Sequence, residues 1–501
     1  MRVLARVGEW VACLARASAI GMIASLALLA YAGGTLRRLF VRDAAARVHL
    51  RRRQRGRLLR WGFARLGATF VKVGQVMSSR PDVYSPEVIA ELRWLQDRVP
   101  PFPFKAVRNI LERELRAPLA ANFRSVDVAP LAAGSVAQVH RAQLLDGTDV
   151  AVKVLRPGVL ARIRRDGRIM LWLAHLATLL SARARVADVV GHVRSLVGGI
   201  LAQTDLRRER QNYDQFRRNF AGAPGLAFPR VYRAQCTRAV LTMEFIDGVR
   251  LDDVAPALLP RVAATLREAF LAMCFDHGFV HADLHAGNVL VRSDGAVVLL
   301  DVGLVKHLSR PLLAQVVDFA RCIAAGTAAE LVAHLRQYHV YLASGDGRRG
   351  ARATDWDAVR RDAEAFIARV RAQPMHALEL SQVVGDLFAL ARRHAIRPLP
   401  EVTLVLVGMV TNEGIAKRLD PNANTLGELA RFIGSTWALV DPTNPSAPPR
   451  RLARGSRRWS RPPLSMTPGP SGGDGGDEPA GGAGHDPPGP GGTAEAAGLH
   501  S

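Results

Sequence analysis

Two β-prone runs near the middle of the chain have the spacing of a tight hairpin. The runs cover 289–291 and 296–300, and a short turn, Arg292-Ser-Asp-Gly295, joins them. An antiparallel pair places the residue before its first strand beside the residue after its second. We therefore expect Asn288 and Asp301 to be neighbours.

A further carboxylate, Asp283, precedes Asn288 by five residues within the segment His281-Ala-Asp-Leu-His-Ala-Gly-Asn288. Carboxylate and amide oxygens are hard ligands that suit Mg²⁺ held together with nucleotide phosphates. In kinase-type phosphoryl transfer, one aspartate orients the acceptor, while an asparagine and a second aspartate hold the metal. We assign the first, catalytic role to Asp283 and the metal role to Asn288 and Asp301. The alternative is a structural turn at the end of the hairpin, whose polar side chains form hydrogen bonds only within the turn.

A lysine lies on an alternating segment earlier in the chain, Val150-Ala-Val-Lys-Val154. A strand here puts the three valines on one face and Lys153 on the other. A lone strand lysine usually extends to water. The loop that precedes it, however, is built of small residues that would let phosphates approach closely, within reach of Lys153. The predicted nucleotide-binding residues of this loop are Ala132, Ala133, Gly134 and Ser135. Lys153 is assigned to nucleotide binding as well and, together with Asp283, to the catalytic residues.

The segment Met243-Glu-Phe-Ile-Asp-Gly248 ends a predicted strand and is expected to link two lobes, with adenine bound near Glu244 and Ile246. The segments occur along the chain in the order found in protein kinases. This order is the small-residue loop, the strand lysine, the linker, the HxDxxxxN segment, the hairpin and the DxG segment. We therefore predict an α+β, two-lobed protein-kinase-like fold that uses ATP and Mg²⁺.

Periodicity and composition divide the chain into five parts. Strands are expected at 230–234 and 239–245, and residues 251–439 are expected to be helical apart from the hairpin. From 441 onwards Pro, Gly, Ser and Ala dominate, which predicts disorder. The parts are a membrane segment with a basic juxtamembrane region (1–60), a helical extension (61–125), an N-lobe with inserted helices (126–248), a helical C-lobe (249–440) and the tail (441–501).

The N-terminal part combines an apolar run with a dense basic cluster. Residues 17–34 are 18 residues without a charge, slightly short of a bilayer core of about 30 Å. Residues 35–60 carry ten arginines against one acid, Asp43. By the positive-inside rule, this arrangement keeps the kinase-like part on the cytoplasmic face. The sequence leaves open whether the run spans the membrane or lies in its interface, and a helix packed on the body is the alternative.

The net charge of +24 indicates an anionic partner. Nucleic acid is disfavoured because the basic cluster is juxtamembrane and lacks interleaved aromatic residues. The four cysteines are scattered without metal-ligand spacing, so neither a zinc site nor a disulfide framework is expected.

Upstream of the kinase-like segments, Lys72-Val-Gly74-Gln75 resembles the KxGQ extension of the UbiB/AarF atypical kinases. The resemblance covers about residues 60–435 and includes the lysine strand, the HxDxHxxN segment and Asn412-Glu413-Gly414. It implies that the KxGQ helix folds over the active site, with Lys72 and Gln75 reaching inward as accessory residues. It also implies ATP binding, slow ATPase or small-molecule kinase activity, and support of isoprenoid quinone biosynthesis at membranes.

Three positions depart from the family pattern. Gly134 stands where alanine is common, which predicts a more flexible loop. Gln203 occupies the expected place of the first acid of an ExD pair, which puts the usual ion pair of Lys153 in doubt. Asp205 keeps the second acid, and Glu209 shares its helical stripe and is a candidate replacement. Val302 replaces the aromatic residue of DFG.

The leading functional prediction is a UbiB-type ATPase or kinase acting on prenylated quinone intermediates or other lipids at the membrane. One alternative is a small-molecule phosphotransferase, since the HxDxHxxN segment also resembles aminoglycoside and choline kinases. Another is a nucleotide-regulated scaffold for quinone-synthesising enzymes, motivated by Gln203. The sequence does not identify the phosphoryl acceptor.

Overall fold

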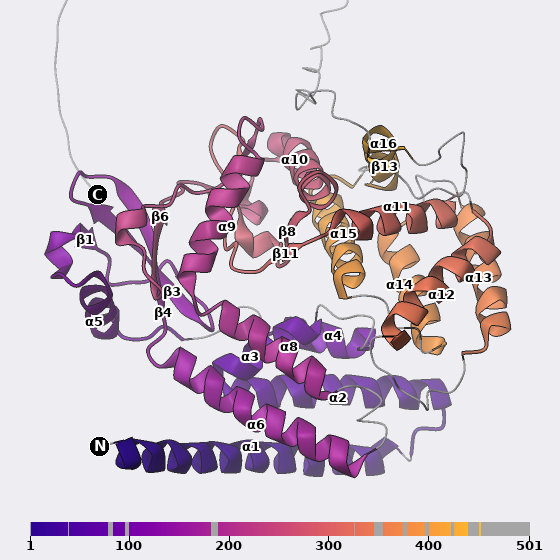
Figure 1. The fold of residues 1–501 in the computed structure, drawn as a ribbon, viewed down its shortest axis with the longest axis horizontal. Coiled ribbons are helices and arrows are strands. Elements are labelled where there is room, and N and C mark those ends of the chain that lie inside the picture. The colour runs from indigo at the N-terminus through magenta and orange to yellow at the C-terminus, as the bar shows by residue number, and fades with distance from the viewer. Residues whose placement is uncertain are drawn as a thin grey trace, which may run out of the picture. The chain divides into compact units, whose positions relative to one another are not determined.

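The computed structural model describes two kinase-like lobes and an N-terminal helical layer (Figure 1). All statements below refer to the described residues, which are 2–38, 40–78, 84–95, 100–181, 189–324, 326–344, 354–373, 378–394, 396, 400–421, 425–438 and 450–451.

The helical layer begins with a long apolar helix and a long basic one, which pack against each other. Asp43 caps the second helix by accepting hydrogen bonds from the backbone N–H groups of Ala45 and Ala46. Gly67 ends that helix with a φ of 84°, a conformation that favours glycine. The chain can therefore turn directly into the next helix. The helices are α1 (Arg2–Arg38), α2 (Ala44–Leu66), α3 (Ala68–Ser78), α4 (Pro86–Arg93) and α5 (Phe104–Leu115).

The N-lobe is a five-stranded sheet of order β1-β3-β4-β6, with β2 pairing β3. As predicted, Val150, Val152 and Val154 share one fully buried face, where α5 residues including Val107 and Leu111 cover them. Burial of this face excludes water from one side of the sheet and fixes the register of the lysine strand. The strands are β1 (Phe123–Val126), β2 (Ala132–Ala133), β3 (Ala137–Leu144), β4 (Asp149–Leu155) and β6 (Val240–Glu244).

Between β4 and β6, the described residues form three inserted helices. They are α6 (Val159–Leu180), α8 (Val189–Ala202) and α9 (Leu206–Asn219). Helix α9 packs against β6 and so approaches the lysine strand from the side.

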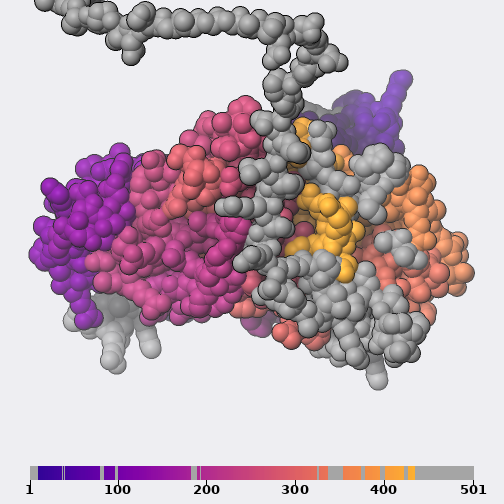
Figure 2. All heavy atoms as spheres, turned by 90° about the horizontal axis from the view of Figure 1, so that it is seen from above, coloured from indigo at the N-terminus to yellow at the C-terminus, as the bar shows by residue number. Residues whose placement is uncertain are grey.

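The C-lobe carries a sheet of order β5-β10-β9-β7 and a separate antiparallel pair, β8 and β11. In the space-filling view its late helices, in orange, occupy the opposite end from the purple N-lobe (Figure 2). The strands are β5 (Leu226–Ala227), β7 (Val249–Arg250), β8 (Phe279–His281), β9 (Val289–Val291), β10 (Val297–Leu299) and β11 (Val305–His307). The helices are α10 (Leu259–Leu271), α11 (Arg310–Ala324), α12 (Ala328–Ser344), α13 (Trp356–Arg371), α14 (Leu380–Arg393), α15 (Pro400–Leu419) and α16 (Thr425–Thr436).

Two local predictions require correction. The strand expected at 230–234 is wrong: Val231 makes a single bridge to Met243, and a 3-10 turn, Arg233–Gln235, follows at once. The expectation of one hairpin in the C-lobe missed the β8–β11 pair, whose strands are too short to produce a visible alternation. In the predicted tail, Arg450–Arg451 pairs with Trp437–Ala438, and the rest of the tail lies outside the described residues.

Candidate nucleotide and metal site

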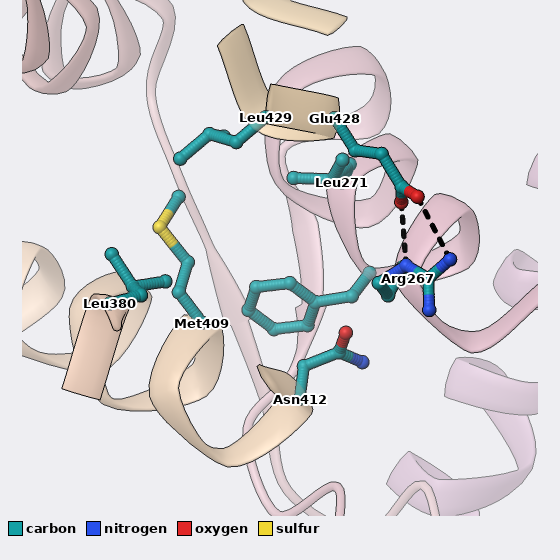
Figure 3. A pocket seen from close by; sticks show the side chains of 8 residues that line it. Arg267, Leu271, Leu380, Met409, Asn412, Glu428 and Leu429 are labelled. Atoms are coloured by element: carbon teal, nitrogen blue, oxygen red, sulfur yellow. Dashed lines mark hydrogen bonds and ion pairs between the residues drawn. The ribbon is translucent and has the colours of Figure 1, made fainter. Parts of the chain in front are cut away.

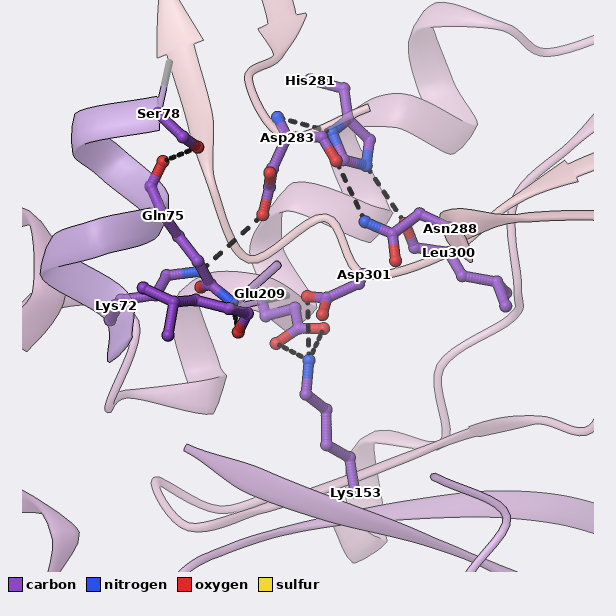
Figure 4. A network of polar contacts seen from close by, with 11 residues as sticks. Lys72, Gln75, Ser78, Lys153, Glu209, His281, Asp283, Asn288, Leu300 and Asp301 are labelled. Carbon is purple, nitrogen blue, oxygen red and sulfur yellow. Dashed lines mark hydrogen bonds and ion pairs between the residues drawn. The ribbon is translucent and has the colours of Figure 1, made fainter. Parts of the chain in front are cut away.

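The hairpin forms as predicted and brings the asparagine to the second aspartate. Val289 pairs with Leu299, and the Leu300 N–H donates to the Asn288 carbonyl oxygen over 2.8 Å. The Asn288 side-chain amide nitrogen donates to the Asp283 carbonyl oxygen over 3.0 Å. Its side-chain oxygen is thereby turned toward Asp301 (Figure 4). The three predicted residues therefore gather at one end of the hairpin.

His281 fixes the backbone that carries Asp283. Its Nδ1 accepts from the Asp283 N–H over 3.2 Å, and its Nε2 lies 3.1 Å from the Leu300 carbonyl oxygen. Burial lowers the pKa of His281, which favours the neutral ring. A neutral ring with its proton on Nε2 satisfies both contacts, so His281 acts as a positioning residue.

Lys153 is held between two carboxylates on the face of β4 opposite the valines (Figure 4). Its Nζ donates to both carboxylate oxygens of Glu209, over 2.7 and 2.9 Å, and to Asp301 Oδ1 over 2.9 Å. Its side chain is 13% exposed, so the interpretation of a lysine extending into water does not apply.

The charges of this cluster shift one another's pKa values. Burial alone would lower the pKa of Lys153, but Asp301 and Glu209 outweigh burial and raise it. Partial loss of hydration would raise the pKa of Asp301, but Lys153 holds it well below its usual range. Burial raises the pKa of Glu209 to about 7, against the opposing effect of Lys153. Lys153 and Asp301 are therefore a charged pair at neutral pH, and Glu209 titrates near neutrality.

Glu209, and not position 203, supplies the ion pair of the strand lysine. Gln203 lies in the turn before α9. Asp205 is the N-cap of α9, where its carboxylate accepts from the Arg207 backbone N–H and pairs with the Arg207 side chain. The doubt raised by Gln203 is thus resolved by Glu209 in the first turn of α9.

Asp301 has an unusual backbone that the sequence did not indicate. Its φ is 49°, in the left-handed region that non-glycine residues seldom adopt. The buried Tyr213 hydroxyl accepts a hydrogen bond from the Asp301 N–H over 3.0 Å, and Asn212 donates to the Val302 carbonyl oxygen over 2.8 Å. At Gly303 an added Cβ would lie 3.2 Å from Asp301 Oδ1. Helix α9 therefore holds the loop of Asp301 in place. In the sequence, this contact was indicated only by the helical spacing of Asn212 from Glu209.

The small-residue loop lies between β2 and β3. The Gly134 N–H donates to the Ala137 carbonyl oxygen over 2.8 Å, and the Gly134 carbonyl accepts from Arg156 Nε over 2.8 Å. Ala132 and Ala133 pair with β3, and Ser135 is half-buried beside them. Gly134 has an ordinary φ, and an added Cβ would meet only the Ala137 carbonyl oxygen, at 3.5 Å. The loop conformation thus accepts either glycine or alanine.

The predicted linker begins at Glu244, whose side chain has structural partners. Its Oε1 accepts from Arg292 over 2.6 Å, and its Oε2 accepts from the Arg230 N–H over 3.0 Å. Ile246 is buried two residues later. Glu244 thus ties the linker to the hairpin turn, and adenine contacts at both positions stay a prediction.

The KxGQ helix, α3, reaches the catalytic loop. Lys72 Nζ lies 3.7 Å from Asp283 Oδ2, and the Lys72 side chain is 12% exposed. Gln75 Nε2 is 3.5 Å from the Leu95 carbonyl oxygen. Between them, a Cβ at Gly74 would lie 2.4 Å from Leu95 Cδ1 and 3.0 Å from Phe63 Cδ2. Glycine thus allows α3 to pack closely against Leu95 and Phe63 at this position.

The oxygen atoms at the hairpin fit Mg²⁺ bound through phosphates. Asp301 is 54% exposed, and the Asn288 side-chain oxygen is directed toward it (Figure 4). Within the described ranges, no group of three or more His, Cys, Asp or Glu side chains could hold a metal without other ligands. Mg²⁺ in kinase-like sites uses one or two protein ligands and completes its shell with phosphates and water. Asn288 and Asp301 would hold the ion, which would neutralise phosphate charge when bound.

A separate pocket lies in the helical C-lobe, away from these residues (Figure 3). Arg267 closes one side by pairing with Glu428, with its Nε and Nη2 atoms 2.5 and 2.9 Å from the two carboxylate oxygens. Asn412 donates to the Leu266 carbonyl oxygen, so its side chain holds α15 against α10. The lining residues are Arg267, Phe270, Leu271, Leu380, Met409, Asn412, Glu428 and Leu429.

Comparisons with known proteins found two family matches, several relatives and a solved structure. Residues 94–333 match the ABC1 atypical kinase-like domain, and residues 363–424 match the UbiB helical domain. The probable protein kinase UbiB of Cellvibrio japonicus is 32% identical over 424 residues, covering 81% of this chain and 74% of that protein. The uncharacterized protein sll1770 of Synechocystis is 32% identical over 388 residues, covering 76% of this chain and 65% of that protein. The solved structure of Rv3197 from Mycobacterium tuberculosis, in complex with erythromycin, has a TM-score of 0.46 and 21% identity, over 70% of this chain and 91% of that one.

These features define a protein with a protein-kinase-like fold: two lobes, a lysine held between two carboxylates, and the cluster of Asp283, Asn288 and Asp301 at the hairpin. With its KxGQ helix and both matching domains, the chain belongs to the UbiB family of ABC1-type atypical kinase-like proteins.

Proposed function

We propose that this protein is an ATP- and Mg²⁺-dependent atypical kinase or ATPase that works at a membrane surface and supports isoprenoid quinone biosynthesis. The observation that carries the proposal is Lys153 Nζ, held within 2.9 Å of both Glu209 and Asp301. A lysine fixed in this way can pair with nucleotide phosphates, while Asn288 and Asp301 hold the metal.

The acceptor side of the site supports slow turnover. Asp283 is the group that would accept the proton of an attacking hydroxyl or water, and Lys72 lies 3.7 Å from its carboxylate. The Lys72 ammonium occupies space beside Asp283 that an acceptor needs. ATP hydrolysis, or transfer to a small or flexible acceptor, fits this arrangement better than transfer to a folded protein.

The quinone role and the membrane location are carried over from the family. The UbiB relatives are named as probable protein kinases, and the kinase-like and helical domains of this chain match the same family. The apolar stretch Trp10–Leu36 in α1 is long and apolar enough to cross a membrane, by length and composition. A lipid-bound quinone precursor is a substrate that such a helix would bring close.

The experiment compares quinones and their intermediates in cells lacking the protein, complemented with either the wild type or Asp301→Asn. We expect an early prenylated intermediate to accumulate without the protein and with Asp301→Asn, and to clear with the wild type. Normal quinone levels with Asp301→Asn would remove the catalytic assignment and leave a scaffold role.

A further inference from the structure

The apolar helix α1 lies lengthwise along the basic helix α2 (Figure 1). Three contacts follow one another in antiparallel order. Gln54 Nε2 donates to the Ala30 carbonyl oxygen over 2.9 Å, and Ile23 Cγ2 lies 3.5 Å from a Cβ placed at Gly62. At the third contact, Arg16 Nη2 donates to the Leu66 carbonyl oxygen over 2.6 Å. The two helices are therefore side by side over most of the apolar stretch.

A buried ion pair fixes the N-terminal half of α1 to the body. Arg16 Nε and Nη2 bond the two carboxylate oxygens of Asp166 in α6, over 2.7 and 3.1 Å. The Asp166 side chain is fully buried, and the Arg16 side chain is 21% exposed. Undocking α1 would break this two-point ion pair and remove the helix that helps to cover Asp166. The docked position is thus part of the folded structure.

Docking leaves the opposite face of α1 exposed and apolar. Residues with intermediate exposure recur at helical spacing along the side that meets α2, for example Arg16, Ile23 and Tyr31. On the outer side, large apolar side chains are between 49 and 72% exposed. These outer residues are Trp10, Leu14, Met22, Leu26, Leu29 and Leu36.

The charge beside this face identifies the partner. Helix α2 carries Arg51, Arg52, Arg53, Arg55, Arg57 and Arg60 next to the apolar helix. Arg51 and Arg55 are exposed, and the Arg55 guanidinium lies 5.7 Å from the centre of the Tyr31 ring of α1, whereas Arg53 and Arg57 pair with Glu91 of α4. An apolar face flanked by exposed arginines matches a bilayer surface with anionic headgroups. A protein groove would satisfy the apolar face but not the length of basic helix beside it.

The same arginines argue against a spanning helix. If α1 crossed the bilayer while docked, α2 would be carried into the hydrocarbon core with its row of arginines. Arginine is among the most costly residues at that depth. We infer that α1 lies in the plane of an anionic lipid surface, docked on α2, with its outer face in the acyl boundary. This inference rests on the membrane location in the proposed function and is independent of the phosphoryl chemistry.

The first test measures binding of the full chain to vesicles of phosphatidylcholine containing phosphatidylglycerol, and to phosphatidylcholine alone. The test variant is Leu26→Glu with Leu29→Glu, and the control is Leu145→Glu, an N-lobe leucine whose exposure of 61% lies between their 49 and 70%. We expect the double variant to bind the anionic vesicles about tenfold more weakly or worse, because apolar area drives insertion. The control should bind like the wild type.

Equal binding of the double variant would overturn the inference, as would a double variant that loses self-association while still binding vesicles. ATP binding without vesicles is measured on the same samples and is expected to be unchanged in all three proteins. Lipid binding without ATP binding would count against the proposed function alone.

The second test asks on which side of the vesicle the N-terminus lies. An N-terminal epitope tag is exposed to protease added outside vesicles that carry the protein on their outer surface. We expect the tag to be removed as fast as the kinase-like lobes are cleaved. A tag that survives until the vesicles are opened would mean that α1 spans the bilayer and would overturn the in-plane arrangement.

Discussion

Lys72 of the KxGQ helix and Asp283 of the catalytic loop form an ion pair, with 3.7 Å between Nζ and Oδ2. A helix that precedes the N-lobe in sequence thus contacts the carboxylate on the acceptor side of the C-lobe. Lys72 also lowers the pKa of Asp301, as a smaller contributor than Lys153. The helical extension is therefore an electrostatic component of the site.

Replacing Lys72 with methionine should raise basal ATP turnover, because it removes the charge that neutralises Asp283. The pair is partly exposed and long, so we expect an effect on the order of 0.5–1 kcal/mol, or about two- to fivefold in rate. Steady-state hydrolysis with purified protein measures it. Lys105→Met, on exposed α5 surface, is the control, and a Lys72→Met enzyme slower than wild type would assign Lys72 to nucleotide binding instead.

Gly74→Ala should destabilise the extension, since its Cβ would lie 2.4 Å from Leu95 Cδ1. Overpacking of this kind costs about 1–3 kcal/mol. Gly414→Ala in α15 is the matched control, because nothing lies within 4 Å of its added Cβ. There the change should stabilise by about 0.4–1 kcal/mol. Urea denaturation compares the two, and equal effects would contradict the packing of α3 against Leu95.

The sequence predicted the positions of the candidate-site residues better than it predicted the short strands. The lysine strand and the hairpin follow local rules of alternation and pairing, so Lys153, Asn288 and Asp301 could be placed from their neighbours alone. The Glu209 contact joins segments 56 residues apart, and only its helical position was available as a signal.

Other features depend on tertiary packing that no local pattern records. Tyr213 holds the backbone of Asp301, which lies 88 residues later, through a hydroxyl that sequence alone would assign to the core. The β8–β11 pair has three residues a strand, fewer than alternation needs to be recognised. Arg16 and Asp166 are 150 residues apart in the sequence. The sequence alone therefore did not predict that α1 docks on the body of the protein.

Glu209→Gln should change how stability depends on pH. Burial raises the pKa of folded Glu209 to about 7, above the ordinary value of 4.5. Between these pH values the folded state binds more protons than the unfolded one, so the contribution of Glu209 to stability falls as pH rises. Glutamine stays neutral and lacks this slope. The melting temperature of the variant relative to wild type should therefore rise from pH 5 to pH 7 and then level off.

Melting curves at closely spaced pH values give this difference directly. The same slope in both proteins would contradict a Glu209 that titrates near neutrality. At pH 8, the variant should bind ATP more weakly than wild type, since Lys153 loses the charged partner that orients it.

Arg16→Met should destabilise the full chain by about 3 kcal/mol, because it leaves Asp166 charged and buried. The double variant Arg16→Met, Asp166→Leu should recover most of this loss, since it removes both charges. Arg47→Met, at an exposed position of α2, should stay within about 0.5 kcal/mol of wild type. Chemical denaturation in detergent-free buffer measures all three, and an Arg16→Met protein as stable as the control would mean that α1 is not docked.

The most direct test of the site is calorimetric titration of ATP with and without Mg²⁺, using the wild type, Asp301→Asn and the hairpin-turn control Asp294→Asn. We predict that Mg²⁺ tightens ATP binding to the wild type and to Asp294→Asn, and that Asp301→Asn loses this tightening. Equal Mg²⁺ dependence in all three proteins would contradict a nucleotide and metal site at Lys153, Asn288 and Asp301.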